Sequence, residues 1–216
     1  MKRLYLLFAV FLICACVQEK KEISGNDIIS ETAIERKPET DLSALKSKAD
    51  EALKFCTMKD FNTDFCILID MSLHSGVKTL FLYGILKINV FQKKYLVGHG
   101  CGSNSWSKDD SRDHPEFSNE DGSHLSSLGK YKLQGRGYSE WGINVKYLMH
   151  GLEETNDNAL ARYIVFHSWD MMSDEETFPK GSPEGWGCPT ISNTAMKEVD
   201  PMIQNSKKPV LMWIYN

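Results

Sequence analysis

Short apolar runs in the middle of the chain alternate with polar residues and are separated by Gly, Asn and Lys. They lie at residues 65–71, 79–83, 86–91 and 94–98. Runs of this length and pattern predict consecutive antiparallel strands, with turns at 75–76 and 92–94. Two further apolar runs, 163–166 and 209–215, predict buried strands, the second closing the chain. The pattern therefore indicates a mainly β domain.

Helical periodicity occurs in two segments. Between residues 41 and 55 the apolar positions fall on one stripe, formed by Leu42, Leu45, Ala49, Ala52 and Leu53. Asp41 can cap the start of this helix, because its carboxylate can accept hydrogen bonds from the first free N–H groups. A second helix is predicted over residues 192–205, with Asn193 as its cap. One or two helices at the edge of a sheet make the domain α+β.

The first residues read as a targeting segment. Lys2 and Arg3 precede the apolar stretch 4–13, which is too short to span a bilayer. The following sequence Ile-Cys-Ala-Cys resembles a bacterial lipobox. We therefore expect residues 1–15 to be a lipoprotein signal peptide and Cys16 to carry the lipid. An ordinary signal peptide without a lipid is the alternative.

Residues 16–40 are rich in Lys, Glu, Ser and Thr and hold few large apolar residues. Such a composition buries too little surface to order itself, which predicts a flexible tether. The folded domain is then expected at 41–216. A lipid on Cys16 would hold it to the membrane of the bacterial cell envelope, on the periplasmic face of the outer membrane or at the cell surface.

The formal net charge of −4 gives no indication of nucleic-acid binding. Four cysteines follow the leader and Cys16, namely Cys56, Cys66, Cys101 and Cys188. An exported protein meets an oxidising compartment, where disulfides form, and four cysteines allow three pairings. If Cys188 is catalytic, Cys56 and Cys66 are the natural pair and Cys101 stays free.

The stretch 162–192 holds the clearest chemistry. His167 ends the predicted strand 163–166, and a polar loop then leads to Gly187 and Cys188. A thiolate is a strong nucleophile, and a nearby imidazole can take its proton. Gly187 allows the backbone to approach a substrate closely, and the N–H of Cys188 can face a developing oxyanion. This arrangement is typical of a cysteine nucleophile with a histidine base.

The same stretch resembles the catalytic motif of the L,D-transpeptidase family, in which a strand-end His precedes a Ser/Thr-His-Gly-Cys segment. His167, Gly187 and Cys188 match that motif, whereas Gly185 and Trp186 replace the Ser/Thr and His. Pro189 and Thr190 stand where the family has an apolar residue and Arg or Asn. The chain looks closer to a divergent Bacteroidetes-type branch of the family with a Gly-Cys-Pro ending. Further similar segments lie at 69–76, 99–103 and 127–131.

The resemblance implies an antiparallel β-sandwich or barrel-like L,D-transpeptidase fold. It also implies acyl transfer on peptidoglycan stem peptides through a thioester on Cys188, with cross-linking or hydrolysis as the outcome. His167 and Gly187 would share the catalytic role. Substrate-binding residues would be His99, Ser127, Arg162 and Trp186. We expect no metal or other cofactor, and a monomer whose partner is peptidoglycan.

Three other interpretations remain open at this stage. A non-catalytic cell-wall-binding lipoprotein could use an aromatic surface of Tyr138, Trp141, Trp169 and Trp186. A zinc site could be formed by His99, Cys101, His167 and Cys188, although no Cys-x-x-Cys pair is present. A papain-like hydrolase would place Cys before His, opposite to the order here. The remaining histidines, His74, His114, His124 and His150, are expected to be solvated.

Overall fold

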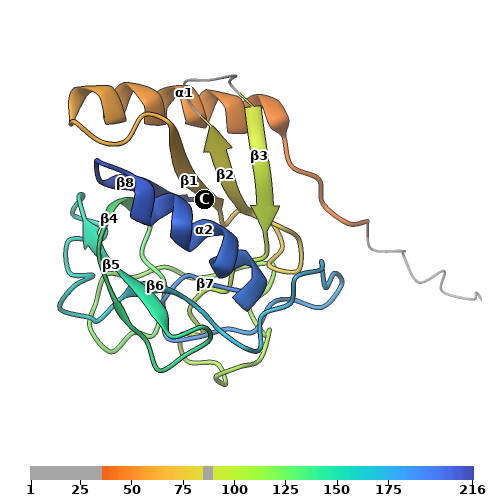
Figure 1. The fold of residues 1–216 in the computed structure, drawn as a ribbon. Helices are drawn as coiled ribbons and strands as arrows, with labels where there is room; N and C mark the ends of the chain where they lie inside the picture. Colours follow the sequence, from red (N-terminus) through yellow and green to blue (C-terminus); the bar gives the residue numbers. More distant parts are fainter. Residues whose placement is uncertain (1–35, 85–89) are drawn as a thin grey trace, which may run out of the picture. The chain divides into compact units, whose positions relative to one another are not determined.

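The structure is a computed structural model that describes residues 36–84 and 90–216. These described residues belong to one compact unit and form an eight-stranded sheet, in the order β3-β2-β1-β8-β4-β5-β6-β7 (Figure 1). The strands are β1 Phe65–Asp70, β2 Leu80–Gly84, β3 Val90–Tyr95, β4 Gly129–Tyr138, β5 Val145–Gly151, β6 Val165–Ser168, β7 Thr190–Ile191 and β8 Val210–Tyr215. The helices are α1 Leu42–Met58 and α2 Asn193–Asn205.

The sheet is nearly closed into a barrel. Gly98, which follows β3 at one edge, makes an isolated antiparallel bridge to Thr190 in β7 at the other edge. The predicted mainly β, barrel-like fold with two helices is therefore confirmed. The pairing is mixed, however, because β8 runs parallel to β1 and β7 runs parallel to β6. In both parallel pairs the chain crosses over between the two strands. The order of apolar runs along the chain does not predict such crossovers.

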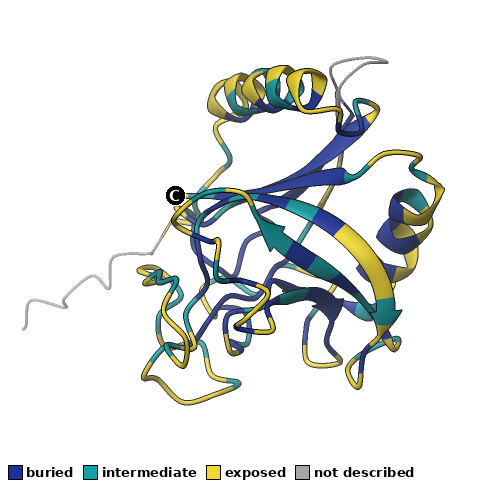
Figure 2. Cartoon of the chain, turned by 90° about the vertical axis from the view of Figure 1, so that its left-hand side faces the viewer, coloured by how far each residue is buried: buried dark blue, intermediate teal, exposed yellow. Residues whose placement is uncertain are grey.

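Two apolar cores lie on opposite faces of β1, β2 and β8. One core joins α1 to alternate residues of these strands, such as Cys66, Leu68 and Trp213. The larger core joins α2 to the opposite alternation, such as Ile67, Ile69 and Met212, and to β4, β5 and β6. This is why the strands of this half of the sheet are buried along almost their whole length (Figure 2).

Both helices begin at a side-chain cap. The Asp41 carboxylate accepts hydrogen bonds from the N–H groups of Ser43 and Ala44, as predicted. On the expected stripe of α1, Leu42 is 68% exposed, because the buried positions begin one turn later. The cap of α2 is Ser192 rather than Asn193, since the Ser192 hydroxyl accepts from the N–H of Ala195. In the described part of the chain, neither helix has the length and apolar character needed to cross a bilayer.

Several local expectations need correction. The turn predicted at 92–94 lies inside β3, which absorbs an extra residue as a bulge opposite Leu82 and Tyr83. The run 86–91 lies partly outside the described residues. Tyr163 is not in a buried strand: it has a φ of +57° and is 86% exposed, and β6 begins two residues later.

The Cys56–Cys66 bridge is not formed, because both residues are free thiols. They are buried where α1 packs on β1, and burial raises the pKa of Cys56 to about 12. The thiols therefore act as small apolar side chains. His74 is also not solvated. It is buried, its Nδ1 accepts the N–H of Gly76, and its ring lies edge-on to Phe178.

Of the predicted tether, residues 36–40 are described and form neither helix nor strand. Lys37 makes an ion pair of 2.8 Å with Glu176. The signal peptide, Cys16 and the rest of the tether lie outside the described residues.

Candidate active site

His167 lies on the outer face of β6, opposite the core. Its neighbour Phe166 points into the core, and the alternation of the strand places the imidazole on the other side. Nδ1 of His167 is 2.9 Å from the carbonyl oxygen of Ser168. Since a carbonyl only accepts, Nδ1 carries the proton and Nε2 keeps its lone pair. The imidazole is therefore held in the tautomer that can act as a base through Nε2.

Cys188 is placed by a tight turn at Gly187. This glycine has a φ of +97°, and a Cβ at this position would stand 2.5 Å from the carbonyl oxygen of Leu125. The carbonyl of Gly187 also accepts a hydrogen bond from the buried Ser126 hydroxyl. Within the described part of the chain, the N–H groups of Gly187 and Cys188 donate no hydrogen bond. They are therefore available to a ligand.

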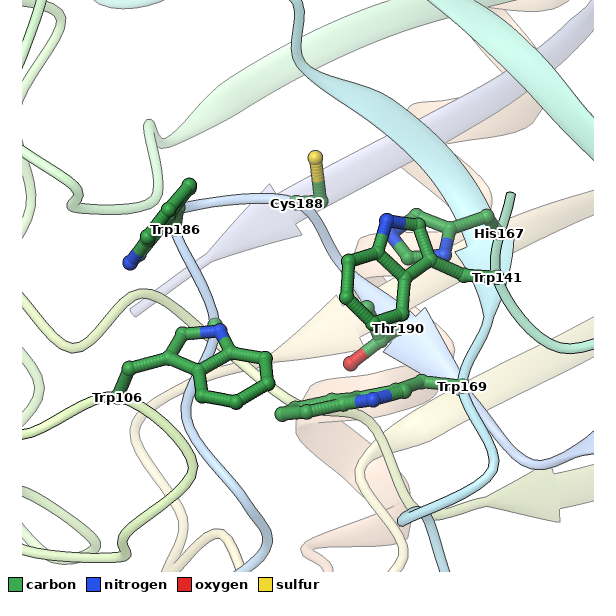
Figure 3. A pocket seen from close by; sticks show the side chains of 8 residues that line it. Trp106, Trp141, His167, Trp169, Trp186, Cys188 and Thr190 are labelled. Atoms are coloured by element: carbon green, nitrogen blue, oxygen red, sulfur yellow. The ribbon is translucent and has the colours of Figure 1, made fainter. Parts of the chain in front are cut away.

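The thiol of Cys188 contacts the start of β6. Its Sγ accepts the N–H of Val165 at 3.4 Å and lies 3.9 Å from the carbonyl oxygen of Tyr163. Among the described residues, no hydrogen bond joins this thiol to His167. The two side chains nevertheless line one cavity (Figure 3). Figure 3 shows the sulfur pointing away from His167, so the thiol has to rotate to contact the imidazole.

Both groups are neutral at rest. Burial lowers the pKa of His167, and the nearby Lys146 charge lowers it further, while the bond to Ser168 opposes these effects. Burial raises the pKa of the Cys188 thiol, opposed by the Val165 N–H and by the charges of Arg162 and Lys146. A neutral imidazole can accept a proton, and a neutral thiol can donate one. Such a pair can transfer the proton while the sulfur attacks a substrate.

Tryptophan side chains form the walls of the cavity, which has a volume of about 120 Å³. Figure 3 shows Trp106, Trp141, Trp169 and Trp186 around the opening beside Cys188. The ring of Trp106 is 5.1 Å from that of Trp169 and 6.2 Å from that of Trp141, measured between centroids. Trp186 is 61% exposed and stacks on His124. Sequence reasoning missed Trp106, which lies in a polar loop far from the motif.

Thr190 lines the same cavity as His167 and Cys188. Its hydroxyl is buried and has no hydrogen-bond partner among the described residues. An unpaired buried hydroxyl costs free energy, so a ligand that supplies a partner gains that energy on binding. The eight lining residues include no Lys, Arg, Asp or Glu.

Of the four residues expected to bind substrate, only Trp186 lines this cavity. Arg162 is buried and holds the loop 118–127 by hydrogen bonds. Its guanidinium donates to the hydroxyl of Ser127 at 2.6 Å and to the carbonyl of Leu125 at 2.7 Å. Ser127 is buried in the same network, where it donates to the carbonyl of Ser118. These two residues therefore support the turn that contacts Gly187.

His99 lies apart from the cavity, under the loop that carries Trp106. Its Nε2 is 3.0 Å from the Ser111 hydroxyl and 3.7 Å from the buried carboxylate of Glu184. Burial lowers the pKa of His99 to about 4. The proposed zinc set is not assembled, since no cluster of three metal-binding side chains occurs in the part of the chain that the structure describes.

The structure is thus a barrel-like β domain with a Cys and a His in one cavity. Comparison with known families identifies the same kind of domain. A model of the L,D-transpeptidase catalytic domain matches residues 36–215, and the chain belongs to this family. No curated protein matches the chain.

Two solved structures illustrate the similarity. The helical cell shape determining protein Pgp2 from Campylobacter jejuni shares 14% identity and a TM-score of 0.43. The match covers 79% of this chain but only 56% of Pgp2, so this chain spans little more than half of that protein. An L,D-transpeptidase from Xylanimonas cellulosilytica shares 10% identity and a TM-score of 0.35, over 75% of this chain and 68% of the other.

Proposed function

We propose that this protein is a cysteine-dependent acyltransferase of the L,D-transpeptidase type that acts on peptidoglycan stem peptides. The observation that carries the proposal is the pair in the cavity: a neutral His167, fixed by Ser168 with Nε2 unprotonated, beside the thiol of Cys188. Membership of the L,D-transpeptidase catalytic domain family supports the substrate class.

In the first half-reaction, Nε2 of His167 takes the thiol proton as Sγ of Cys188 attacks the carbonyl carbon of an L-centre. The carbonyl oxygen becomes an oxyanion, which the free N–H groups of Gly187 and Cys188 can stabilise. The C–N bond then breaks, the proton passes from the imidazole to the leaving amine, and a thioester remains. In the second half-reaction an amine or water attacks the thioester carbonyl and loses a proton to His167. The C–S bond then breaks, the imidazole returns the proton to Sγ of Cys188, and a new amide or a carboxylic acid leaves.

Purified muropeptides provide the direct test. Incubation with the wild-type protein should release a terminal amino acid and leave a mass adduct on Cys188. Cys188→Ser should give neither product nor adduct. Wild-type protein that forms no adduct and no product with any tetrapeptide donor would refute the proposal.

A non-catalytic cell-wall-binding function is the second candidate, favoured by the four tryptophans around the cavity. It predicts that muropeptides quench tryptophan fluorescence equally in the wild type and in Cys188→Ser, without turnover in either. The catalytic proposal also allows binding by Cys188→Ser, so turnover by the wild type separates the two.

We also propose that a lipid on Cys16 anchors the protein in the bacterial cell envelope, with the domain reaching peptidoglycan on a tether. The support is the lipobox-like sequence and the polar composition that follows it.

A further inference from the structure

The donor peptide proposed above raises a question of charge. The residue that leaves ends in a carboxylate. Beside an aromatic cavity a carboxylate loses hydration, which costs free energy unless a cation pairs with it. The residues that line the cavity offer no cation, and Thr190 occupies the place where the related family has Arg or Asn. A counter-charge for the donor must therefore come from just outside the cavity. This inference rests on the proposed function.

Two cationic side chains, Arg162 and Lys146, are near enough for their charges to lower the pKa of the Cys188 thiol. Arg162 is buried, and both of its terminal nitrogens already donate to the loop 118–127. Lys146 is half-buried, and no carboxylate lies within 4.0 Å of its ammonium in the part of the chain that the structure describes. Of the two, only Lys146 is free to pair with an incoming anion.

The register of the sheet places Lys146 beside the catalytic histidine. Lys146 in β5 is the direct partner of His167 in β6, so the two side chains leave the sheet on the same face. Val145 and Tyr147 point into the core, which confirms that Lys146 points outwards. On its other side Lys146 pairs with Gly137, and its Cε lies 3.9 Å from where a Cβ of that glycine would stand.

Within 4 Å, a Cβ at residue 137 would meet only this Cε, so the aliphatic part of the Lys146 side chain lies against Gly137. We propose that Lys146 is a positioning residue that binds the terminal carboxylate of the acyl-donor peptide. It would hold the scissile carbonyl between Cys188 and His167.

Steady-state kinetics of the full chain test this role with paired donor peptides, one ending in a free carboxylate and one in an amide. The wild type should prefer the free acid. Lys146→Met should raise KM for the acid about tenfold, leave kcat nearly unchanged and abolish the preference, whereas Lys146→Arg should keep it.

Lys132 provides a matched control. It lies on the same outer face of β4, pairs with His150 rather than with the catalytic histidine, and has no ion pair among the described residues. Lys132→Met should therefore behave as the wild type. Equal preference for the acid in the wild type and in Lys146→Met, or an equal loss in Lys132→Met, would overturn the proposal.

A second measurement tests the anion site without turnover. If no turnover is found, the proposed function fails, but this measurement still shows whether Lys146 attracts an anion to Cys188. The rate of Cys188 alkylation by iodoacetate is divided by the rate with iodoacetamide at one pH. The ratio cancels changes in the thiolate fraction and reports only attraction of the anionic reagent. Lys146→Met should lower this ratio about threefold, and Lys132→Met should not. An unchanged ratio in Lys146→Met contradicts the assignment of Lys146 as an anion site.

Discussion

At the scale of the residue, the chemistry depends on which groups are neutral. Burial lowers the pKa of His167 and raises that of the Cys188 thiol, so both favour the uncharged form at neutral pH. In the proposed reaction the imidazole therefore has to take the thiol proton. The carbonyl of Ser168 selects the tautomer, which explains why no third side chain is needed to orient His167.

A pH profile tests this assignment. Because the folded-state pKa of His167 is lowered, the base stays unprotonated below the ordinary histidine value, and turnover should persist to pH values under about 6.5 before it falls. In His167→Ala, turnover at neutral pH should drop by roughly 100-fold and partly recover at alkaline pH, where the thiol ionises unaided.

The same variant should slow alkylation of Cys188 at neutral pH. Cys101→Ser serves as the control, since that thiol is buried in a loop and does not line the cavity. If His167→Ala alkylates at the wild-type rate at every pH, His167 is not the base.

At the scale of the element, the turn before Cys188 depends on one glycine. Gly187→Ala forces a Cβ to within 2.5 Å of a backbone oxygen at a φ of +97°, so something must shift. We expect it to lower the free energy of unfolding by about 2 kcal/mol and to displace the thiol. Gly185→Ala is the matched comparison for stability, because a Cβ added at residue 185 would meet nothing within 4 Å. Urea denaturation of both variants distinguishes a specific requirement at 187 from a general need for glycine.

The loop that carries Trp106 is tied to the irregular segment before Cys188 by a buried cluster. Glu184 accepts hydrogen bonds from the N–H and the hydroxyl of Ser111, and its backbone pairs with Ser107 and Lys108. His99 completes the cluster through Ser111. The cluster thus joins the loop with Trp106 to the segment that leads into the turn with Cys188.

Acid should weaken this cluster. His99 has a pKa of about 4 in the folded protein, against 6.5 for an ordinary histidine, because burial disfavours its charged form. Between these values the unfolded chain binds a proton that the folded chain does not. The stabilisation is therefore complete above pH 6.5 and is lost as the pH falls towards 4.

Chemical denaturation at a series of pH values measures this effect. The wild type should lose on the order of 1 kcal/mol per pH unit in that window through this one group. His99→Gln should flatten the profile, whereas His114→Gln, at an exposed position, should not. An identical pH dependence in the wild type and in His99→Gln would show that another group controls acid stability.

At the scale of the whole molecule, the domain and its attachment are separate questions. The family match begins at residue 36, within the segment expected to be a tether, and all the described helices and strands lie beyond it. The predicted boundaries of the signal peptide, tether and domain at 15 and 40 remain predictions, as do the monomeric state and the envelope location.

Metabolic labelling with a radioactive fatty acid tests the anchor. Label should appear on the wild type and disappear in Cys16→Ser, which should also move from the membrane fraction to the soluble fraction. Cys14→Ser is the control, since it changes a neighbouring cysteine that should not receive the lipid. Label that persists in Cys16→Ser would rule out this attachment.

The sequence by itself determined the elements whose pattern is local. The apolar runs of β1, β2 and β8 are visible in the chain because both faces of these strands are buried. The stripe of α1 is visible because one face of that helix is buried. The turns and caps were less secure: a bulge extended β3 through a predicted turn, and Ser192 displaced Asn193 as a cap. The motif of His167, Gly187 and Cys188 was readable because its members lie close together in the chain.

Only the tertiary structure decided what surrounds that motif. It placed Arg162 and Ser127 in a buried support, moved His99 under a loop, and brought Trp106 and Trp141 to the cavity. It also set Lys146 beside His167 through the register of β5 and β6. These relations join residues on different strands and loops. Their positions depend on how a nearly closed sheet brings its edges together, and no local pattern of apolar and polar residues encodes that closure.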